Sequence, residues 1–216
     1  MRLHPIVFAG LVALPSISSI HAQNAASTPR RLGIAAGINS STLGGGDVED
    51  ASRRTGFIGG IFLVAPLAPG FAIQPELLYS MKGAKFEDAS EGITGTLKMD
   101  YVEVPLLLRF DLSSSGGVRP FIYAGPAISF KASCKAEVEG QGQSASVDCN
   151  EFEGNAAIKT VDYGAVVGGG LAFDMAGRMF TLGARYNQGM AKISDESTTK
   201  HRVISVLATL EFPWGK

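Results

Sequence analysis

The stretch that decides the fold is Lys98-Met-Asp-Tyr-Val-Glu-Val-Pro-Leu-Leu-Leu-Arg-Phe-Asp111. Its apolar side chains recur at every second position, which is the period of a β-strand with one face in an apolar environment. One face carries Val102, Val104, Leu106, Leu108 and Phe110, and the opposite face carries Tyr101, Glu103 and Arg109. This pattern predicts a strand that separates an apolar phase from a polar interior.

Seven further segments alternate in the same way. They are residues 31–40, 56–65, 71–82, 119–131, 162–174, 178–190 and 202–212. In the second strand we expect Gly60 to face inward and Ile61 outward. In the strand over 119–131 we expect the even positions, such as Ile122 and Phe130, to face outward. The chain is therefore predicted to be all-β, with eight antiparallel strands.

The connections between these strands are short and long in turn. Residues 66–70, 112–118 and 175–177 are short turns, whereas residues 41–55, 83–97, 132–161 and 191–201 are long and polar. This alternation is typical of an up-and-down transmembrane β-barrel with periplasmic turns and extracellular loops. A soluble ligand-binding barrel would turn its apolar faces inward. Eight strands leave room inside for side chains only, so we expect no open channel.

The N-terminus has the order of a secretory signal peptide. Arg2 is followed by nine apolar residues, Ile6 to Leu14, and Ala22 suits cleavage. Nine residues are too few for a membrane helix, which needs about 20. The predicted organisation is a signal peptide over 1–22, a periplasmic lead-in over 23–30, the barrel over 31–212 and a C-terminal tail over 213–216.

Several segments of the sequence also resemble a known family. They are Ile73-Gln-Pro-Glu-Leu-Leu-Tyr-Ser-Met-Lys-Gly83, Tyr101-Val-Glu-Val-Pro-Leu-Leu-Leu-Arg109, Arg119-Pro-Phe-Ile-Tyr-Ala-Gly-Pro126, Gly168-Gly-Gly-Leu-Ala-Phe173 and Leu182-Gly-Ala-Arg-Tyr186. The chain resembles the outer-membrane protein β-barrel domain family, which includes PorT-like proteins and is related in architecture to the small OmpX and OmpA barrels. The resemblance implies an outer-membrane barrel but no particular activity. Such barrels commonly end on an aromatic residue, here either Phe212 or Trp214.

Composition limits the other classes of function. The net charge of −1 shows no basic excess, so no nucleic-acid partner is expected. In an oxidising compartment Cys134 and Cys149 are expected to form a disulfide. No cysteine–histidine set or calcium-loop spacing occurs, so we expect no cofactor and no metal.

Five charged residues lie at the alternate strand positions whose side chains are expected to face inward. They are the candidate site residues of this chain. They are Glu76, Glu103, Arg109, Arg185 and Glu211. Inside a narrow barrel such groups can pair through charge-assisted hydrogen bonds. We expect a structural charge network that fills the lumen, and the alternative is an ion gate or an acid–base pair.

The function is expected to be structural, adhesive or assembly-related rather than catalytic. The expected partners are outer-membrane lipid, lipopolysaccharide and the barrel-assembly machinery, with an extracellular ligand or a secretion-system partner at the long loops. The alternatives are a small-solute porin and a lipid A-modifying hydrolase or acyltransferase. An enzyme would need Ser197, His201 and Asp195 or Glu196 to converge at the outward, lipid-facing rim.

Overall fold

The computed structural model describes residues 29–45, 51–88, 92–112, 116–140, 143–151, 158–193 and 198–215. Its strands are β1 (Arg30–Gly44), β2 (Ala51–Ala68), β3 (Phe71–Asp88), β4 (Ile93–Asp111), β5 (Val118–Gly140), β6 (Gln143–Asp148), β7 (Val161–Met175), β8 (Arg178–Gly189) and β9 (Lys200–Trp214). A 3₁₀ turn, η1 (Cys149–Glu151), follows β6. Within these residues no helix is long and apolar enough to cross a bilayer.

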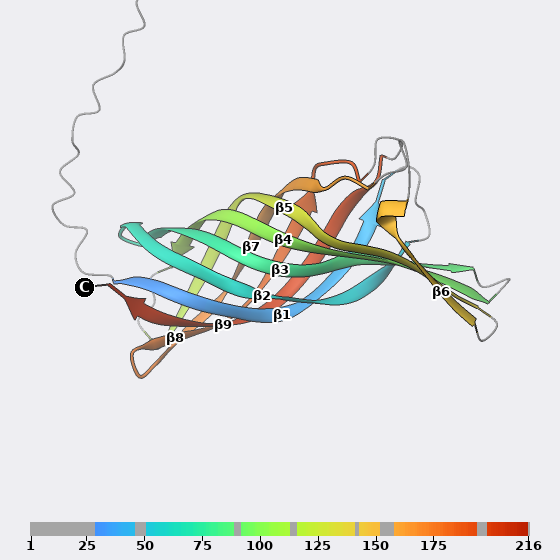
Figure 1. Ribbon diagram of the computed structural model, residues 1–216. Coiled ribbons are helices and arrows are strands. Elements are labelled where there is room, and N and C mark those ends of the chain that lie inside the picture. The colour runs from blue at the N-terminus through green and yellow to red at the C-terminus, as the bar shows by residue number, and fades with distance from the viewer. Residues whose placement is uncertain are drawn as a thin grey trace, which may run out of the picture.

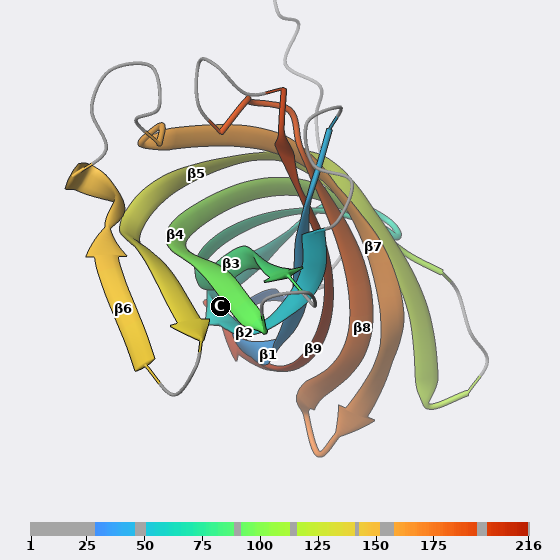
Figure 2. The ribbon, with the colours of Figure 1, turned by 90° about the vertical axis from the view of Figure 1, so that its right-hand side faces the viewer.

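Eight of the strands close into a ring. Each pairs antiparallel with its neighbours in the order β4-β3-β2-β1-β9-β8-β7-β5, and pairing of β4 with β5 completes the circle. Figure 2 shows this ring in a view along its axis, with β6 outside it. The prediction of an eight-stranded antiparallel barrel is confirmed.

The two faces of each strand differ as the alternation predicted. On β4 the positions from Val104 to Leu108 that face outward are exposed, whereas Glu103 and Arg109 are buried. The two choices of face made above are also confirmed: Ile61 is exposed and its neighbour Phe62 is buried, and Ile122 on β5 is exposed. The apolar side chains thus lie on the outside of the ring and many polar ones inside it.

Aromatic side chains border the apolar outer surface at both ends. Phe57, Tyr79, Phe130 and Tyr163 lie toward one end, and Phe71 and Trp214 lie toward the other, all of them exposed. Two aromatic borders around an apolar band are the usual surface of a barrel that spans a membrane.

The strands extend farther than the alternation predicted. β3 continues to Asp88, β4 starts at Ile93, and β5 reaches Gly140 before turning back as β6. Most of the second expected loop, and much of the third, is therefore β-sheet that projects from the right-hand end of the ring in Figure 1. The expectation of loops was wrong here because these segments alternate over only five or six residues, with few large apolar side chains, and so resemble polar loops.

The C-terminal boundary also differs from the expected one. Residues 213–216 were expected to form a tail, but β9 runs to Trp214, which pairs with Arg30 at the start of β1. The barrel strands thus begin at Arg30 and end at Trp214, side by side at one end of the ring. The predicted signal peptide over 1–22 and nearly all of the lead-in over 23–30 lie outside the described residues.

The expected disulfide is present and joins Cys134 of β5 to Cys149. Since Lys135 pairs with Asp148, the disulfide closes the base of the β5–β6 hairpin. Both cysteines are buried beside Met99 and Tyr101 of β4. The bond therefore ties the projecting hairpin to the outer end of the barrel core.

Candidate functional site: the lumen

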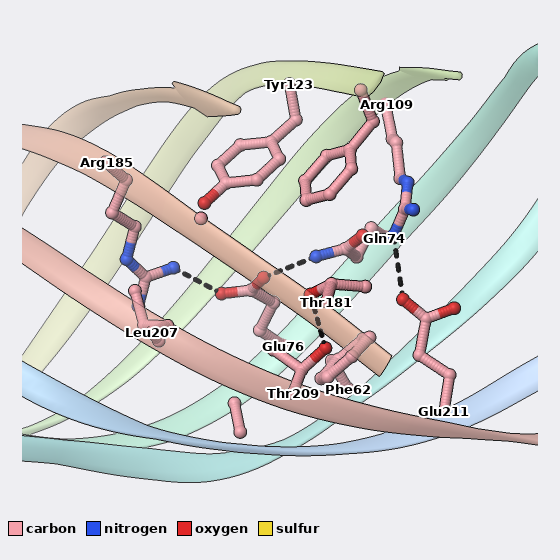
Figure 3. Close-up of a pocket in the computed structure, with 13 residues that line it drawn as sticks. Phe62, Gln74, Glu76, Arg109, Tyr123, Thr181, Arg185, Leu207, Thr209 and Glu211 are labelled. Carbon is pink, nitrogen blue, oxygen red and sulfur yellow. Dashed lines mark hydrogen bonds and ion pairs between the residues drawn. The ribbon is translucent and has the colours of Figure 1, made fainter. Parts of the chain in front are cut away.

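The middle of the lumen is crossed by an ion pair between Glu76 of β3 and Arg185 of β8. Arg185 Nη1 donates to Glu76 Oε2 over 2.7 Å, and both side chains are nearly inaccessible to solvent. The other carboxylate oxygen, Oε1, accepts a 2.7 Å hydrogen bond from Gln74 Nε2. Figure 3 shows Glu76 held between these two donors. Both oxygens of the buried carboxylate thus have a partner, as a buried charge requires.

A second group of charges lies closer to the end of the barrel that carries the short turns. Arg109 Nη1 of β4 donates to Glu211 Oε1 of β9 over 2.9 Å, as Figure 3 shows. Arg31 Nε donates to the other oxygen of Glu211 over 2.6 Å, and Arg109 Nε donates to Asp111 over 2.8 Å. The Arg109 guanidinium also lies 4.1 Å from the centre of the Phe121 ring. Glu211 is completely buried and is satisfied by two arginines.

The opposite end of the lumen holds a third group. Lys82 of β3 forms a buried salt bridge with Glu103 on the adjacent strand β4. Tyr101 Oη lies 3.3 Å from His201 Nε2 of β9, and the two rings meet edge to face. Lys82 Nζ also lies 5.0 Å from the centre of the Tyr101 ring. A cation, an acid, a phenol and an imidazole therefore pack together here.

Three of these contacts join opposite walls of the barrel. β3 and β8 are four positions apart in either direction around the ring, and so are β4 and β9. The pairs Tyr101–His201, Glu76–Arg185 and Arg109–Glu211 therefore span the lumen at its outer end, middle and inner end, and they are called the cross-lumen contacts below. An eight-stranded ring is narrow enough for such side chains to meet across it.

The structure brings the five candidate residues into three groups. Glu76 meets Arg185 and Arg109 meets Glu211, whereas Glu103 meets Lys82, a residue outside the candidate set. Sequence reasoning also missed three partners of these groups: Arg31, Gln74 and Asp111. Strand parity could have added Lys82, Gln74 and Arg31, because each is an even number of residues from an inward-facing residue of its strand.

A cavity of about 30 Å³ remains between the middle and inner groups. It is lined by Gln74, Glu76, Arg109, Tyr123 and Arg185 among others. The Nη2 atoms of Arg109 and Arg185 are buried and have no hydrogen-bond partner among the described residues. A cavity of this size holds about two water molecules, which can satisfy such donors.

The only histidine after the predicted cleavage site does not face lipid. His201 is 2% exposed and contacts Tyr101 inside the barrel. Residues 195, 196 and 197, which the catalytic alternative needs, lie outside the described residues. The outward-facing imidazole on which that alternative depends is therefore not present in this arrangement.

The family model of the outer membrane protein beta-barrel domain matches residues 21–195, which is most of the chain. The chain belongs to this family. As a member of it, the protein is an outer-membrane β-barrel of the bacterial envelope, which confirms the resemblance and the location predicted above. A search of curated proteins found no match.

The chain is also similar to solved structures of outer-membrane proteins. Neisserial surface protein A is 14% identical, and the alignment covers 85% of this chain and 97% of that one with a TM-score of 0.50. Ail of Yersinia pestis is 16% identical over 85% of this chain and 99% of its own, with a TM-score of 0.42. The outer-membrane enzyme PagL is 12% identical over 84% and 99%, with a TM-score of 0.40. At these identities the similarity concerns the fold only.

The outer-membrane β-barrel assignment gives the two ends of the ring a direction. In such barrels the short turns face the periplasm and the long connections face the outside. By this rule the turn before Phe71 and the Ala176–Gly177 turn mark the periplasmic end. The β5–β6 hairpin and the Tyr101–His201 contact then lie at the extracellular end.

Proposed function

We propose that this outer-membrane β-barrel is a non-catalytic binding protein that closes its lumen with its own side chains and contacts an extracellular partner through its projecting sheet. The observation that carries the proposal is the continuation of the barrel strands beyond the apolar outer surface. The projecting part consists of residues 84–88, 93–97, 135–140 and 143–148, and it is called the outer sheet below.

The outer sheet has a free edge. All six residues of β6 are exposed, and within the described residues β6 pairs with β5 only. The unpaired backbone groups of an edge strand can bind an extended peptide as an additional strand. Proteins usually protect such edges with lysine or proline, and Gln143-Ser-Ala-Ser-Val-Asp148 contains neither. The edge is therefore suited to binding an extended segment of a partner protein.

The support for a closed lumen is the set of cross-lumen contacts. Glu76, Arg109, Arg185 and Glu211 are each less than a tenth exposed and meet near the barrel axis. Solutes could pass only if several buried ion pairs separated, and an unpaired buried charge is costly. Liposome swelling with purified protein tests this part of the proposal. We expect no swelling above empty liposomes in small sugars, and steady swelling would favour the porin alternative.

Adhesion of bacteria that carry the chain tests the binding proposal. Cells expressing the wild type are compared with cells expressing S144P/S146P, which removes two backbone donors that point away from β5 at the free edge of β6. Surfaces coated with a panel of extracellular proteins provide the partners. We expect the wild type to adhere to at least one surface and the variant to lose that adhesion. Equal adhesion of both, or no adhesion above cells that lack the chain, would contradict the proposal.

A control variant separates folding from binding. G117A changes a residue next to the start of β5, at the opposite, periplasmic end, and should leave adhesion unaffected. All variants must show the gel mobility shift on heating that marks a folded barrel.

We also propose that the barrel-assembly machinery inserts this chain into the outer membrane. An alternative to the binding role is membership of a secretion apparatus, which the resemblance to PorT-like proteins favours.

A further inference from the structure

Three basic side chains lie together on the outer surface of the barrel where β2, β1 and β9 leave the apolar band. They are Arg53, Lys200 and Arg202, and they are called the basic rim patch. Arg53 and Arg202 are exposed. Lys200 is two residues from Arg202 on β9 and therefore shares its face. Since β1 pairs with both β2 and β9, all three side chains flank a single strand.

Both arginine side chains of the basic rim patch lie over β1. Arg53 Nη1 donates to the carbonyl oxygen of Ser40 over 3.3 Å. The Arg202 guanidinium lies against Gly44, where an added Cβ atom would be 2.7 Å from Cζ. Ser40 and Gly44 are four residues apart, which is about 13 Å along a strand. The two guanidinium groups thus occupy separate positions along β1, and Lys200 pairs opposite Gly44.

The apolar band begins directly below the basic rim patch. Ile38, Phe57 and Ile204 are 60%, 48% and 43% exposed on the same three strands. Ser40 lies two residues beyond Ile38, about 7 Å farther along β1. Lipid headgroups occupy a layer of about 5 to 8 Å on each side of the hydrocarbon core. Arg53, over Ser40, therefore lies at the depth of the outer-leaflet headgroups, whereas Arg202, over Gly44 and about 20 Å beyond Ile38 along β1, lies farther out.

Two basic residues on the β4 and β5 side of this rim have partners. Lys98 forms a salt bridge with Glu137, and Lys131 Nζ donates to the carbonyl oxygen of Ile158. Asp100 on the same side would repel an anion, and it accepts a hydrogen bond from Tyr79. Among the side chains that the structure describes, no carboxylate forms a salt bridge with Arg53 or Arg202. Both guanidinium groups are therefore exposed on the lipid-facing rim beside β1.

We propose that the basic rim patch is a binding site for the two phosphates of a diphosphorylated saccharide lipid, the lipid A part of lipopolysaccharide. Guanidinium groups bind phosphate through two parallel N–H donors. Two guanidiniums at positions about 13 Å apart along β1 suit two phosphates on one rigid headgroup better than the single phosphate of a phospholipid. Acyl chains of the same lipid would lie on Ile38, Phe57 and Ile204.

This inference deepens the proposed function and rests on its orientation of the barrel, but it concerns a different surface from the outer sheet. The double variant R53Q/R202Q should therefore lose lipid binding and keep the adhesion that depends on β6. Loss of adhesion in S144P/S146P with normal lipid binding is the reciprocal result. Failure of one proposal is in this way distinguishable from failure of the other.

Titration of the detergent-solubilised full chain with three lipids tests the site. The probes are diphosphoryl lipid A, monophosphoryl lipid A and phosphatidylglycerol, and native mass spectrometry measures the bound fraction. We expect the wild type to bind diphosphoryl lipid A about tenfold more tightly than either other lipid, and R53Q/R202Q to lose about that factor. R53K/R202K keeps the charge without the planar donors and should bind with intermediate affinity.

The matched control is K85Q/K135Q, which removes the same charge from exposed lysines of the outer sheet. It should bind diphosphoryl lipid A like the wild type. Equal binding by wild type and R53Q/R202Q would overturn the site, and an equal loss in K85Q/K135Q would show that only overall charge matters. Equal affinity of the wild type for all three lipids would overturn the requirement for two phosphates. The mobility shift on heating confirms that each variant is folded.

Discussion

Arg185 on β8 donates a 2.7 Å hydrogen bond to Glu76 on β3, a strand on the diametrically opposite wall of the barrel. The contact joins the two walls directly, without a backbone element between them. A narrow barrel filled in this way is held by its sheet on the outside and by ion pairs within. The consequences of that arrangement can be measured.

The first prediction concerns the Glu76–Arg185 pair. E76L leaves the Arg185 charge buried without its acid, which should lower the free energy of unfolding by about 3 to 5 kcal/mol. E76L/R185M replaces both charges with apolar groups and should recover most of that loss, because an apolar pair of similar volume is often no worse than a buried ion pair. Urea unfolding of the refolded barrel in micelles, followed by gel mobility, measures both. A double variant as unstable as E76L would contradict the pairing.

The second prediction concerns the disulfide. Reduction, or the double substitution C134S/C149S, should free the β5–β6 hairpin and leave the barrel intact. The chain-entropy estimate for a loop of this length is about 3 kcal/mol, and we expect the loss to fall on the hairpin. Limited proteolysis of folded protein should then cut between residues 134 and 149 at an increased rate. A reduced barrel that loses its mobility shift on heating would show that the bond supports the whole fold instead.

The third prediction concerns a close approach of two strands. A Cβ atom at Gly125 of β5 would lie 2.0 Å from the backbone carbonyl oxygen of Leu106 on β4. G125A must therefore push two paired strands apart, and overpacking of this kind costs about 1 to 3 kcal/mol. Gly117 has open space at the same position, so G117A is the matched control. The yield of refolded barrel and its midpoint in urea measure the difference, and equal midpoints would contradict this reading of the strand spacing.

The fourth prediction separates this barrel from a lipid A-modifying enzyme. His201 lies inside the barrel against Tyr101, so it is placed to pack and not to activate a lipid-facing serine. Lipid A from cells that lack the chain, express it, or express H201Q should have the same mass spectrum. A change in acylation that appears with the wild type and disappears in H201Q would establish catalysis and refute the proposed function.

The sequence predicted the faces of the strands inside the membrane because lipid and lumen act on alternate residues there. On β9, for example, Ile204 and Val206 are exposed while Ser205 and Glu211 are buried, as their positions indicated. The outer sheet escaped prediction because its alternation is short and weak. Ile93-Thr-Gly-Thr-Leu97 and Ser144-Ala-Ser-Val-Asp148 alternate over only five residues with few large apolar side chains, so they resemble polar loops.

Which charged side chains pair inside the lumen could not be predicted from the alternation of inward and outward positions along each strand. Parity shows that Glu103 points inward, but only the closure of the ring and the stagger of its strands decide which inward residue it meets. Glu103 meets Lys82 on the neighbouring strand, whereas Arg109 reaches across to Glu211. Lys82 was overlooked because it is the last residue of the strand expected over 71–82, next to an expected loop.

The cross-lumen contacts also affect the order of events during folding. Their partners are 100, 109 and 102 residues apart in the chain, and each joins opposite walls that meet only after the ring has closed. Interactions absent from the transition state slow unfolding without speeding folding. We therefore expect these three contacts to act on the lifetime of the inserted barrel: they allow assembly to proceed at its own rate and then oppose the reverse reaction.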